Sequence, residues 1–291
     1  MKRVLITGSN SGIGRATAIH LGQHGYEVFA AMRNLDKAER LLELAAKEKS
    51  KVHPIKLDVN DDVSVNQAIG ELISESGPID VLINNAGVGM NATLEDVDIE
   101  EAKQVFDTNF WGIIRCTQAV LPAMREKRSG HIVNISSVAG RIAALAQVIY
   151  SSSKWAVECL SESLAQEVAP FGLRVSLIEP GVTRTAILPK NVGHPTPTVY
   201  EPAYRRMLQF YASGIAANVR AEKVAEVIHG ALEDPKGRFR YACAWGGEEL
   251  CAGRAGISDE DWIALGRHQE DSDYYAAFKH LFKLGIGPDT E

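Results

Sequence analysis

Short apolar runs alternate with longer segments of helical period along most of the chain. Continuous apolar runs bounded by turn residues are typical of strands buried on both faces of a sheet. Such strands are predicted at 4–6, 28–31, 81–83, 132–135 and 175–178, with a weaker candidate at 52–57. Apolar positions of helical spacing predict helices between them, at 13–24, 36–49, 62–76, 100–128 and 148–170. The sequence therefore predicts an α/β fold, with a doubly wound, Rossmann-type parallel sheet and crossover helices.

The chain is longer than these elements require. A further strand is predicted at 239–242, and the remainder, 246–291, is a C-terminal extension. Its apolar side chains, partly at helical spacing, are expected to pack on the body of the protein or on a partner subunit. They are Trp262, Leu265, Tyr274, Tyr275, Phe278, Leu281 and Phe282. At 291 residues the whole chain, 1–291, is expected to form a single domain.

Composition and charge argue against several classes of function. The formal net charge of −6 gives no basic footprint for a nucleic acid, and no apolar run is long enough to span a membrane. The first residues run directly into a predicted strand without a signal peptide, which indicates a cytoplasmic protein. The four cysteines form no C-x-x-C pair and the eight histidines form no H-E-x-x-H motif. Neither a disulfide framework nor a catalytic metal is therefore expected.

A glycine-rich loop joins the first predicted strand to the first predicted helix. Its glycines, Gly8, Gly12 and Gly14, follow the spacing Gly-x-x-x-Gly-x-Gly. Glycine lets the backbone turn sharply and approach a ligand closely, and a helix that starts near Ile13 directs its N–H groups at an anion. The loop therefore predicts a site for the pyrophosphate of a dinucleotide. The residues expected to bind the cofactor here are Gly8, Ser11, Gly12, Ile13 and Gly14.

The end of the second predicted strand bears on the choice of dinucleotide. NAD-preferring enzymes usually place an acidic residue there to bind the ribose hydroxyls, whereas this chain has Met32 followed by Arg33. The Arg33 guanidinium suits a ribose 2′-phosphate, so NADP(H) is expected in preference to NAD(H). The alternative is a surface arginine beside a helix start. Asp36 is interpreted as the N-cap of the next helix.

Tyr150 and Lys154 are the candidates for proton transfer. Within the predicted helix 148–170 they are spaced i, i+4 and lie on one face. The neighbouring ammonium, together with the positive ring of an oxidised nicotinamide, is expected to lower the pKa of Tyr150 toward working pH. Such a phenol can act as general acid and base at a substrate oxygen. The alternative is a solvated helix with a surface lysine and a core tyrosine.

Taken together, these motifs resemble the compact, single-domain branch of the short-chain dehydrogenase/reductase family. The similarity covers residues 3–185 and extends to one residue of the predicted helix 100–128 and to short motifs after the other predicted strands. These are Asp58-Val59, Asn84-Asn85-Ala86-Gly87, Asn109, Ile135-Ser136-Ser137, and Pro180-Gly181 with Thr185. A weaker similarity, in the Arg33 position, the 239–242 strand and the extension, is to hydroxysteroid and retinol dehydrogenase-like members.

The resemblance implies a catalytic set of Asn109, Ser137, Tyr150 and Lys154. Tyr150 would donate and accept the proton, and Ser137 would hydrogen-bond the substrate oxygen. Lys154 would hold the nicotinamide ribose and lower the pKa of Tyr150, and Asn109 would organise a water that links Lys154 to solvent. The implied cofactor contacts are Asp58 and Val59 at the adenine, Asn85, Gly87, Tyr150 and Lys154 on the ribose side, and Pro180, Gly181, Val182 and Thr185 at the carboxamide and pyrophosphate.

Three of these assignments have structural alternatives. The segment 85–87 fixes a strand end as readily as it touches a cofactor. Ser136 faces the site instead of Ser137 if the strand register shifts by one, although Ser137 is preferred. Asn109 is disfavoured in a helix by propensity, which favours a function for it, but a helix kink bonded through the backbone is another reason for its presence.

The segment 186–217 is expected to form a lid over the substrate, because an α/β sheet opens its crevice at the carboxyl ends of its strands. Gly193, Pro195 and Pro197 favour a bent entry, and Arg205 and Arg206 are expected to point to solvent. The apolar face of the lid helix is predicted to comprise Tyr200, Tyr204, Met207, Leu208 and Tyr211, with Val88, Met90 and Leu145 near the mouth. Such a lining favours a bulky apolar substrate. The alternative is that the stripe belongs to the core or to a subunit contact.

The sequence thus predicts an NADP(H)-dependent oxidoreductase that interconverts an alcohol and a ketone or aldehyde by direct hydride transfer. The expected substrate is of the hydroxysteroid, retinoid or aryl-ketone kind. The alternatives are a non-catalytic NADPH-binding sensor or scaffold, a 3-oxoacyl thioester reductase and a sugar-nucleotide epimerase. The expected partners are the small-molecule substrate and copies of the same chain, as a homo-dimer or homo-tetramer, and no nucleic acid or membrane.

Overall fold

A parallel sheet of seven strands forms the centre of the protein. The computed structural model describes residues 1–185 and 199–288. The strands are β1 (Arg3–Ile6), β2 (Glu27–Met32), β3 (Val52–Lys56), β4 (Val81–Asn84), β5 (Gly130–Ile135), β6 (Leu173–Pro180) and β7 (Arg240–Cys243). Their order in the sheet is β3-β2-β1-β4-β5-β6-β7, and every neighbouring pair is parallel. The predicted Rossmann-type sheet is confirmed, including the weak candidate at 52–57.

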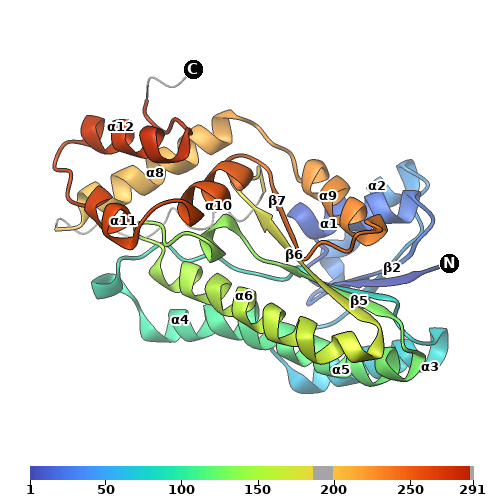
Figure 1. Cartoon of the computed structure of the whole chain (residues 1–291). Coiled ribbons are helices and arrows are strands. Elements are labelled where there is room, and N and C mark those ends of the chain that lie inside the picture. Colours follow the sequence, from blue (N-terminus) through green and yellow to red (C-terminus); the bar gives the residue numbers. More distant parts are fainter. Residues whose placement is uncertain (186–198, 289–291) are drawn as a thin grey trace.

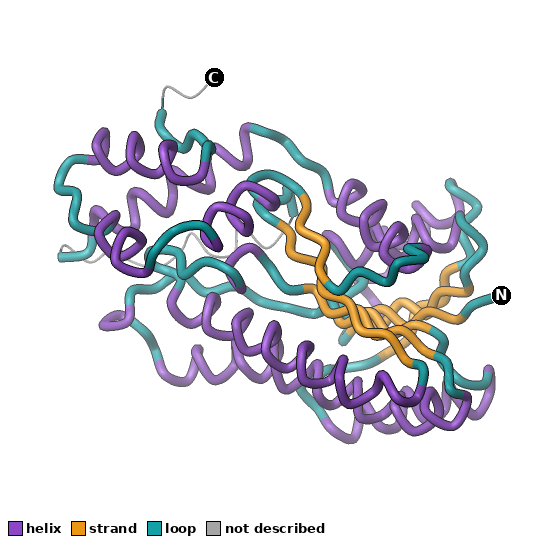
Figure 2. Tube along the Cα trace, in the orientation of Figure 1, coloured by secondary structure: helices purple, strands orange, loops and turns teal. Residues whose placement is uncertain are grey.

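Helices cover both faces of this sheet (Figures 1 and 2). One face carries α1 (Gly12–Gln23), α2 (Glu39–Lys47) and α9 (Ala221–Glu233). The other face carries α3 (Asp62–Ser76), α5 (Gly112–Lys127) and α6 (Val148–Val168). Strand β1 shows why both faces are covered, because Val4 and Ile6 enter the core beneath α1 and α9 while Leu5 enters the opposite core.

Two predicted helices differ in detail from the observed ones. The single helix expected at 100–128 consists of α4 (Ile99–Phe106), a π-helical turn at Asp107–Trp111, and α5. The helix expected at 36–49 begins as a 3-10 turn at Leu35–Ala38 before α2. Its N-cap is Asn34, whose side chain accepts a hydrogen bond from the Asp36 N–H (2.9 Å). The interpretation of Asp36 as the cap is therefore wrong, because the extended backbone that a cap requires lies two residues earlier.

The C-terminal extension folds back on the body of its own chain. The helices α8 (Glu201–Ala216), α10 (Gly247–Ala255), α11 (Asp259–Leu265) and α12 (Asp271–Phe282) lie together at one end of the molecule (Figure 1). Apolar side chains of the extension share one core with Val138 and Ile142, which follow β5. Among the helices that the structure describes, none is long and apolar enough to cross a membrane.

The carboxyl ends of the strands form the edge at which the candidate site lies. Strand β1 pairs with β2 on one side and with β4 on the other, so the order of the sheet reverses there. Parallel sheets open a crevice at such a reversal.

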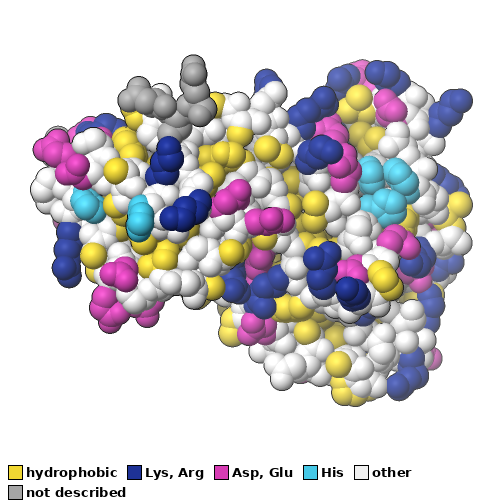
Figure 3. Space-filling model, turned by 45° about the horizontal axis from the view of Figure 1, so that its top comes forward, with side chains coloured by type: hydrophobic (Ala, Val, Ile, Leu, Met, Phe, Trp, Pro, Cys, Tyr) yellow, Lys and Arg dark blue, Asp and Glu magenta, His cyan; other side chains and the backbone are white. Residues whose placement is uncertain are grey.

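On the face seen in Figure 3, cationic and anionic side chains are interspersed, and a compact group of histidines lies at the end that carries α1 and α9.

Candidate active site

A cleft of about 520 Å³ runs along the carboxyl edge of the sheet. Most of the residues assigned to catalysis and cofactor binding line it. They are Gly8, Ser11, Gly12, Ile13, Arg33, Asp58, Val59, Asn85, Gly87, Ser137, Tyr150, Lys154, Pro180, Gly181, Val182 and Thr185. Gly14 and Asn109 are not among the lining residues. The topology thus brings motifs from six separate loops of the chain into one site.

The loop between β1 and α1 presents free backbone donors to the cleft. Gly8 and Gly12 have φ angles of +68° and +54°, a conformation that residues with a side chain rarely adopt. Helix α1 has no side-chain cap and no acidic residue in its first turn. By contrast, Asp61 and Asp98 bind the first N–H groups of α3 and α4. The N-terminus of α1 is therefore available to an anion such as a pyrophosphate.

Asn85 and Gly14 hold this loop in place. Asn85 Nδ2 donates to the carbonyl oxygens of Thr7 (2.8 Å) and Gly8 (3.2 Å). Thr7 Oγ1 in turn accepts from the N–H groups of Asn85 and Ala86, both at 3.0 Å. A Cβ atom on Gly14 would collide with the Gly8 carbonyl oxygen and with Asn85 Nδ2. Asn85 thus fixes the loop against the end of β4 while it borders the cleft, and Gly14 allows the close packing behind the loop.

Two cations border the cleft where it meets β2. Arg33 and Lys37 both line it, together with Met32. Both basic side chains are exposed, and no ion pair within residues 1–185 and 199–288 engages either of them. Sequence reasoning missed Lys37. The signal that was present is a second cation four residues after Arg33, at the start of the next helical segment.

Ser137 and Tyr150 lie against each other in the middle of the cleft. The Ser137 side chain is hydrogen-bonded to that of Tyr150. Its Oγ also accepts from the Ala139 N–H (3.1 Å), at the start of a 3-10 turn. The buried Oγ of Ser136 has no hydrogen-bond partner among the described residues. The serine that contacts the phenol is therefore Ser137 and not Ser136.

Lys154 lies one turn after Tyr150 in α6. Its buried Nζ donates to the Ile135 carbonyl oxygen (2.8 Å) and lies 5.8 Å from the centroid of the Tyr150 ring. Burial lowers the pKa of Lys154 to about 8, although the nearby Glu158 opposes this shift. Burial also raises the pKa of Tyr150, and the hydrogen bond with Ser137 only partly counteracts it. In the protein without cofactor, loss of hydration disfavours the phenolate more than its polar neighbours favour it. The lowered pKa that is expected for Tyr150 beside an oxidised nicotinamide stays a prediction.

Asn109 lies behind these side chains, in the π-helical turn. Its Oδ1 accepts from the Val88 N–H and its Nδ2 donates to the Val88 carbonyl oxygen, both at 2.9 Å. Nδ2 also donates to Ser153 Oγ (3.1 Å). A Cβ atom on Gly87 would lie 3.4 Å from Asn109 Oδ1 and 3.9 Å from Lys154 Nζ, so the two groups converge on one point. Asn109 therefore ties the loop after β4 to the helix beside Lys154, in a π turn of the kind often found at functional sites.

Sequence reasoning also missed Gln147. This buried residue is the N-cap of α6, lines the cleft and precedes Tyr150 by three positions. Its side-chain amide donates to the Tyr211 hydroxyl. Burial, together with the nearby Tyr150, raises the pKa of Tyr211. Helix α8 thus reaches Gln147 and the surroundings of Tyr150 through Tyr211. The signal in the sequence was that Gln147, a polar residue, directly precedes the predicted helix that contains Tyr150.

A second, apolar cavity of about 180 Å³ adjoins the cleft. The two share Ile142, Ala144, Gln147 and Phe210. The remaining wall combines Leu145 with residues of α8 and of the C-terminal extension. These include Met207, Trp262, Leu265, Tyr274, Phe278 and Ile286. Val88 lines the main cleft, but Met90 is buried in a separate cluster with Ala102 and Val105, so its expected place at the mouth is wrong.

The predicted apolar face of α8 is narrower than expected. Tyr204 and Met207 are buried, whereas Leu208 is 41% exposed. At 100° per residue, Tyr200, Tyr204, Met207 and Tyr211 form one stripe, and Leu208 lies roughly 70° to its side. Gly193, Pro195 and Pro197, which are expected to give the lid a bent entry, lie outside the described residues.

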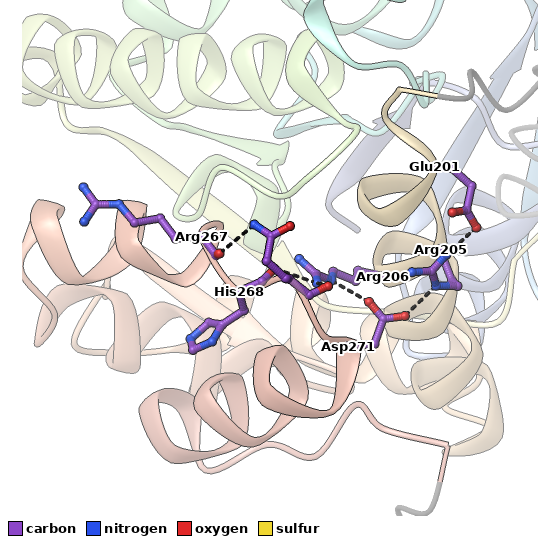
Figure 4. A network of polar contacts seen from close by, with 7 residues as sticks. Glu201, Arg205, Arg206, Arg267, His268 and Asp271 are labelled. Atoms are coloured by element: carbon purple, nitrogen blue, oxygen red, sulfur yellow. Dashed lines mark hydrogen bonds and ion pairs between the residues drawn. The ribbon is translucent and has the colours of Figure 1, made fainter.

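Arg206 anchors α8 to the C-terminal extension, which contradicts the expected solvent position (Figure 4). It is 5% exposed, and its Nε donates to Asp271 Oδ1 (2.8 Å). Nη2 donates to the carbonyl oxygens of His268 (2.9 Å) and Gln269 (3.2 Å). The guanidinium lies 4.6 Å from the centroid of the Tyr274 ring. Arg205 remains largely exposed and pairs with Asp271 and Glu201.

The fold and the cleft together are those of an oxidoreductase built on a Rossmann-type sheet. The family model described as short chain dehydrogenase matches residues 2–194. The chain therefore belongs to the short-chain dehydrogenase family, oxidoreductases that act on CH–OH groups with NAD(P)(H).

Individual relatives are similar over most of the chain. Oxidoreductase BOA17 of Botryotinia fuckeliana is 36% identical over 89% of this chain and 96% of its own length. Human 17-beta-hydroxysteroid dehydrogenase type 1 is 37% identical over 82% of this chain and 76% of its own length. Among solved structures, a short-chain dehydrogenase from Streptomyces avermitilis is 31% identical, with a TM-score of 0.78 over 92% of this chain and 100% of that one.

Proposed function

We propose that the protein is an NADP(H)-dependent oxidoreductase that interconverts a bulky apolar alcohol and the corresponding ketone or aldehyde. The observation that carries the proposal is the convergence of Ser137, Tyr150 and Lys154 in a cleft that also contains an uncapped helix N-terminus. A protein that only binds the dinucleotide would need the free helix N-terminus. It would not need a buried lysine beside a tyrosine whose hydroxyl interacts with a serine side chain.

The lining of the cleft fits NADP(H) at each of its polar groups. The free N–H groups at Gly12 and Ile13 suit the pyrophosphate. Arg33 and Lys37, which form no ion pair with any residue that the structure describes, suit a ribose 2′-phosphate. The adenine is assigned to Asp58 and Val59, the ribose side to Asn85, Gly87, Tyr150 and Lys154, and the carboxamide end to Pro180, Gly181, Val182 and Thr185. When bound, NADP(H) supplies or accepts the hydride.

Tyr150 performs the proton transfer. In reduction, the phenol gives its proton to the carbonyl oxygen as that oxygen becomes an alkoxide, and in oxidation the phenolate takes the proton back from the alcohol. Because burial raises the pKa of Tyr150, the phenol is protonated and ready to act as an acid at neutral pH. Ser137 donates a hydrogen bond to the substrate oxygen and so holds it beside Tyr150.

Lys154 and Asn109 support this transfer. The Lys154 ammonium, 5.8 Å from the Tyr150 ring centroid, stabilises the phenolate that remains after the proton has left. Its neighbour Asn109 keeps the loop after β4 in contact with the site through both polar atoms of Val88. We also assign to Asn109 the role of organising a water that links Lys154 to solvent.

Helix α8 and the apolar cavity support a bulky apolar substrate. Tyr211 and Phe210 of α8 border the cleft, and Met207 borders the adjoining cavity. A substrate whose carbonyl lies at Tyr150 would extend its apolar part past Ile142 into that cavity. The C-terminal extension closes it with Trp262 and Phe278. This wall favours a hydroxysteroid-, retinoid- or aryl-ketone-like compound over a sugar or a small charged acid.

The test is consumption of NADPH against a panel of ketosteroids, retinal, aryl ketones and acetoacetyl thioesters. The proposal predicts turnover with at least one bulky apolar carbonyl compound, and a lower rate with NADH at equal concentration. Best activity on the thioester would favour a 3-oxoacyl reductase instead. Tight binding of NADPH without turnover of any panel member would favour a sensor or scaffold.

A further inference from the structure

Three histidines form a cluster on the side of the protein away from the catalytic cleft. His20 and His24 lie at the end of α1, and His229 lies on α9. The histidine group in Figure 3 lies over these two helices. One ring nitrogen from each of the three lies within 4.8 Å of the others. None of the three lines the cleft or the apolar cavity.

We propose that His20, His24 and His229 form a site for a transition-metal ion such as Zn²⁺, which clamps the end of α1 to α9. Imidazole is a preferred ligand of Zn²⁺, and three protein ligands with water in the fourth tetrahedral position are a common arrangement. The site is separate from the proposed catalytic function, and neither depends on the other.

The spacing of the ring nitrogens suits such an ion. His20 Nε2 and His229 Nδ1 lie 3.1 Å apart. Two nitrogens bound tetrahedrally at 2.0–2.1 Å from zinc are about 3.3 Å apart, so the ion can replace the single proton that this pair now shares. The third nitrogen has to approach by only about 1.5 Å, from at most 4.8 Å, to reach the tetrahedral spacing. His24 is the exposed member of the three, so its side chain has the most room to adjust.

A metal-binding histidine is usually oriented by a hydrogen bond from the ring nitrogen that does not bind the metal, and His24 already makes such a contact. Its Nδ1 lies 2.7 Å from the His20 carbonyl oxygen. A carbonyl oxygen only accepts, so Nδ1 is the donor in this contact, and Nε2 is the ring nitrogen that a metal ion would bind. Metal-binding histidines usually donate their second nitrogen to a carbonyl or carboxylate in this way.

The surroundings favour a cation. His20 is in the last turn of α1 and His24 is its C-cap, where the helix dipole presents its negative end. Both rings are partly buried, His20 in α1 and His229 in α9. Two carboxylates are close enough to act on the rings, Glu226 on His20 and Glu233 on His229. Glu226 pairs with Lys223, and Glu233 with Lys2 and Tyr26, so neither is needed as a ligand.

The experiment is a titration of the full-length, chelator-treated protein with Zn²⁺ in competition with a chromophoric chelator, repeated with Co²⁺ to record its absorption spectrum. We expect one equivalent per chain, with a spectrum typical of tetrahedral nitrogen coordination. Loss of a hydrogen bond that orients a metal ligand weakens binding by about 10- to 100-fold. His24→Ala and His229→Gln each remove a ligand itself, so each should weaken Zn²⁺ binding by at least as much. The thermal midpoint of the wild type should rise with Zn²⁺, and that of either variant should not.

His280→Ala is the matched control, because His280 is an exposed histidine on α12, outside the cluster. It should bind Zn²⁺ as the wild type does. Zn²⁺ binding that survives in both cluster variants would place the ion elsewhere, for example on the exposed thiol of Cys159, and would overturn the proposal. A wild type that binds no tighter than His24→Ala would also overturn it. The NADPH-dependent activity of the variants is a separate readout and should stay unchanged.

Discussion

The two halves of the catalytic cleft are built in different ways. The cofactor half consists of short loops that directly follow β1, β2, β3, β4, β5 and β6, and some of its side chains bond across neighbouring strands. Thr7 and Asn85 are an example, joined by hydrogen bonds between the ends of β1 and β4. The substrate half consists of α8 and the C-terminal helices, and contacts such as Arg206 with Asp271 hold it together over 65 residues of sequence.

This difference separates chemistry from specificity. The sheet and α6, which packs on it, fix the positions of the anion-binding loop and of Tyr150, so the proposed reaction depends on residues that local motifs encode. The apolar cavity depends on how α8, α11 and α12 pack on Ile142 and Leu145. Changes in the first half should therefore alter turnover or cofactor binding, and changes in the second should alter stability or the choice of substrate.

The largest effect is expected from Tyr150→Phe. This change removes one oxygen and keeps the packing, so turnover should fall by about 10²–10⁴-fold or more while NADPH affinity persists. Tyr275→Phe, which removes a hydroxyl in the C-terminal extension, is the control. Initial rates and a fluorescence titration with NADPH measure the two quantities. A variant that keeps near-normal turnover would end the proposed role of Tyr150.

Asp271→Asn should give the largest effect in the substrate half. It leaves the buried Arg206 without its anionic partner, and the free energy of unfolding should fall by about 3 kcal/mol, the low end for a broken buried pair because Asp271 is partly exposed. Asp273→Asn, at an exposed position in the same helix, should have little effect. Chemical denaturation measures both. Equal stability of the two variants would show that the ion pair does not anchor α8.

Arg33→Ala tests the cofactor half at its other end. Loss of a charge-assisted contact of about 1.5–3 kcal/mol should weaken NADPH binding by about 10- to 100-fold and leave NADH binding nearly unchanged. Lys37→Ala should act in the same direction. Arg40→Ala, one turn further on and outside the cleft, is the control. If the wild type prefers NADH in a direct competition of rates, the assignment of Arg33 is wrong.

Met207→Ser and Leu208→Ser form a matched pair in the substrate half. Met207 lines the apolar cavity and Leu208, its neighbour, faces solvent. Loss of buried apolar surface at Met207 should raise KM for a large apolar ketone by about tenfold, with a smaller rise for a small ketone. The Leu208 variant should change neither. Equal effects of Met207→Ser on both substrates would contradict the place of the cavity in substrate binding.

The smallest effect is a shift along the pH axis. Burial raises the pKa of Tyr150, so alcohol oxidation, which needs the phenolate, should become faster as the pH rises, while ketone reduction stays level through neutral pH. Lys154→Met removes a positive charge near the phenolate and should move the rising limb of oxidation to higher pH. The measurement is kcat/KM for oxidation against pH in both proteins. Identical midpoints would show that Lys154 does not act on Tyr150 through its charge.

The sequence predicts the cofactor half well, for a physical reason. Buried parallel strands appear as continuous apolar runs, and the polar residues after them meet at one edge because the strands are parallel. All seven strands lie where the pattern indicates. Lys37 and Gln147 escaped notice because neither belongs to a motif, and each enters the cleft only through the path of the chain after β2 and before α6.

The substrate half is harder to predict, because the environment of its residues depends on tertiary contacts with residues far away in the sequence. Arg206 carries a full charge, which indicates solvent until Asp271 and two backbone carbonyls are seen around it. The π turn at Asn109 and the direction of the Tyr150 pKa shift likewise depend on packing and burial. His20 and His24 are spaced i, i+4, which a search for helical ligand pairs would find, but His229 reaches them only through the packing of α9 on α1.

The central claim is that Tyr150 supports direct hydride transfer between NADPH and a carbonyl carbon in this cleft. It is tested most directly with NADPH that carries deuterium at the transferable position of the nicotinamide, with the most active ketone of the panel as substrate. The account predicts that the wild type places the deuterium on the carbinol carbon of the product, one for each NADPH consumed, and that Tyr150→Phe forms almost none of this product. Label that appears in solvent, or equal product from the Tyr150→Phe variant, would contradict the account.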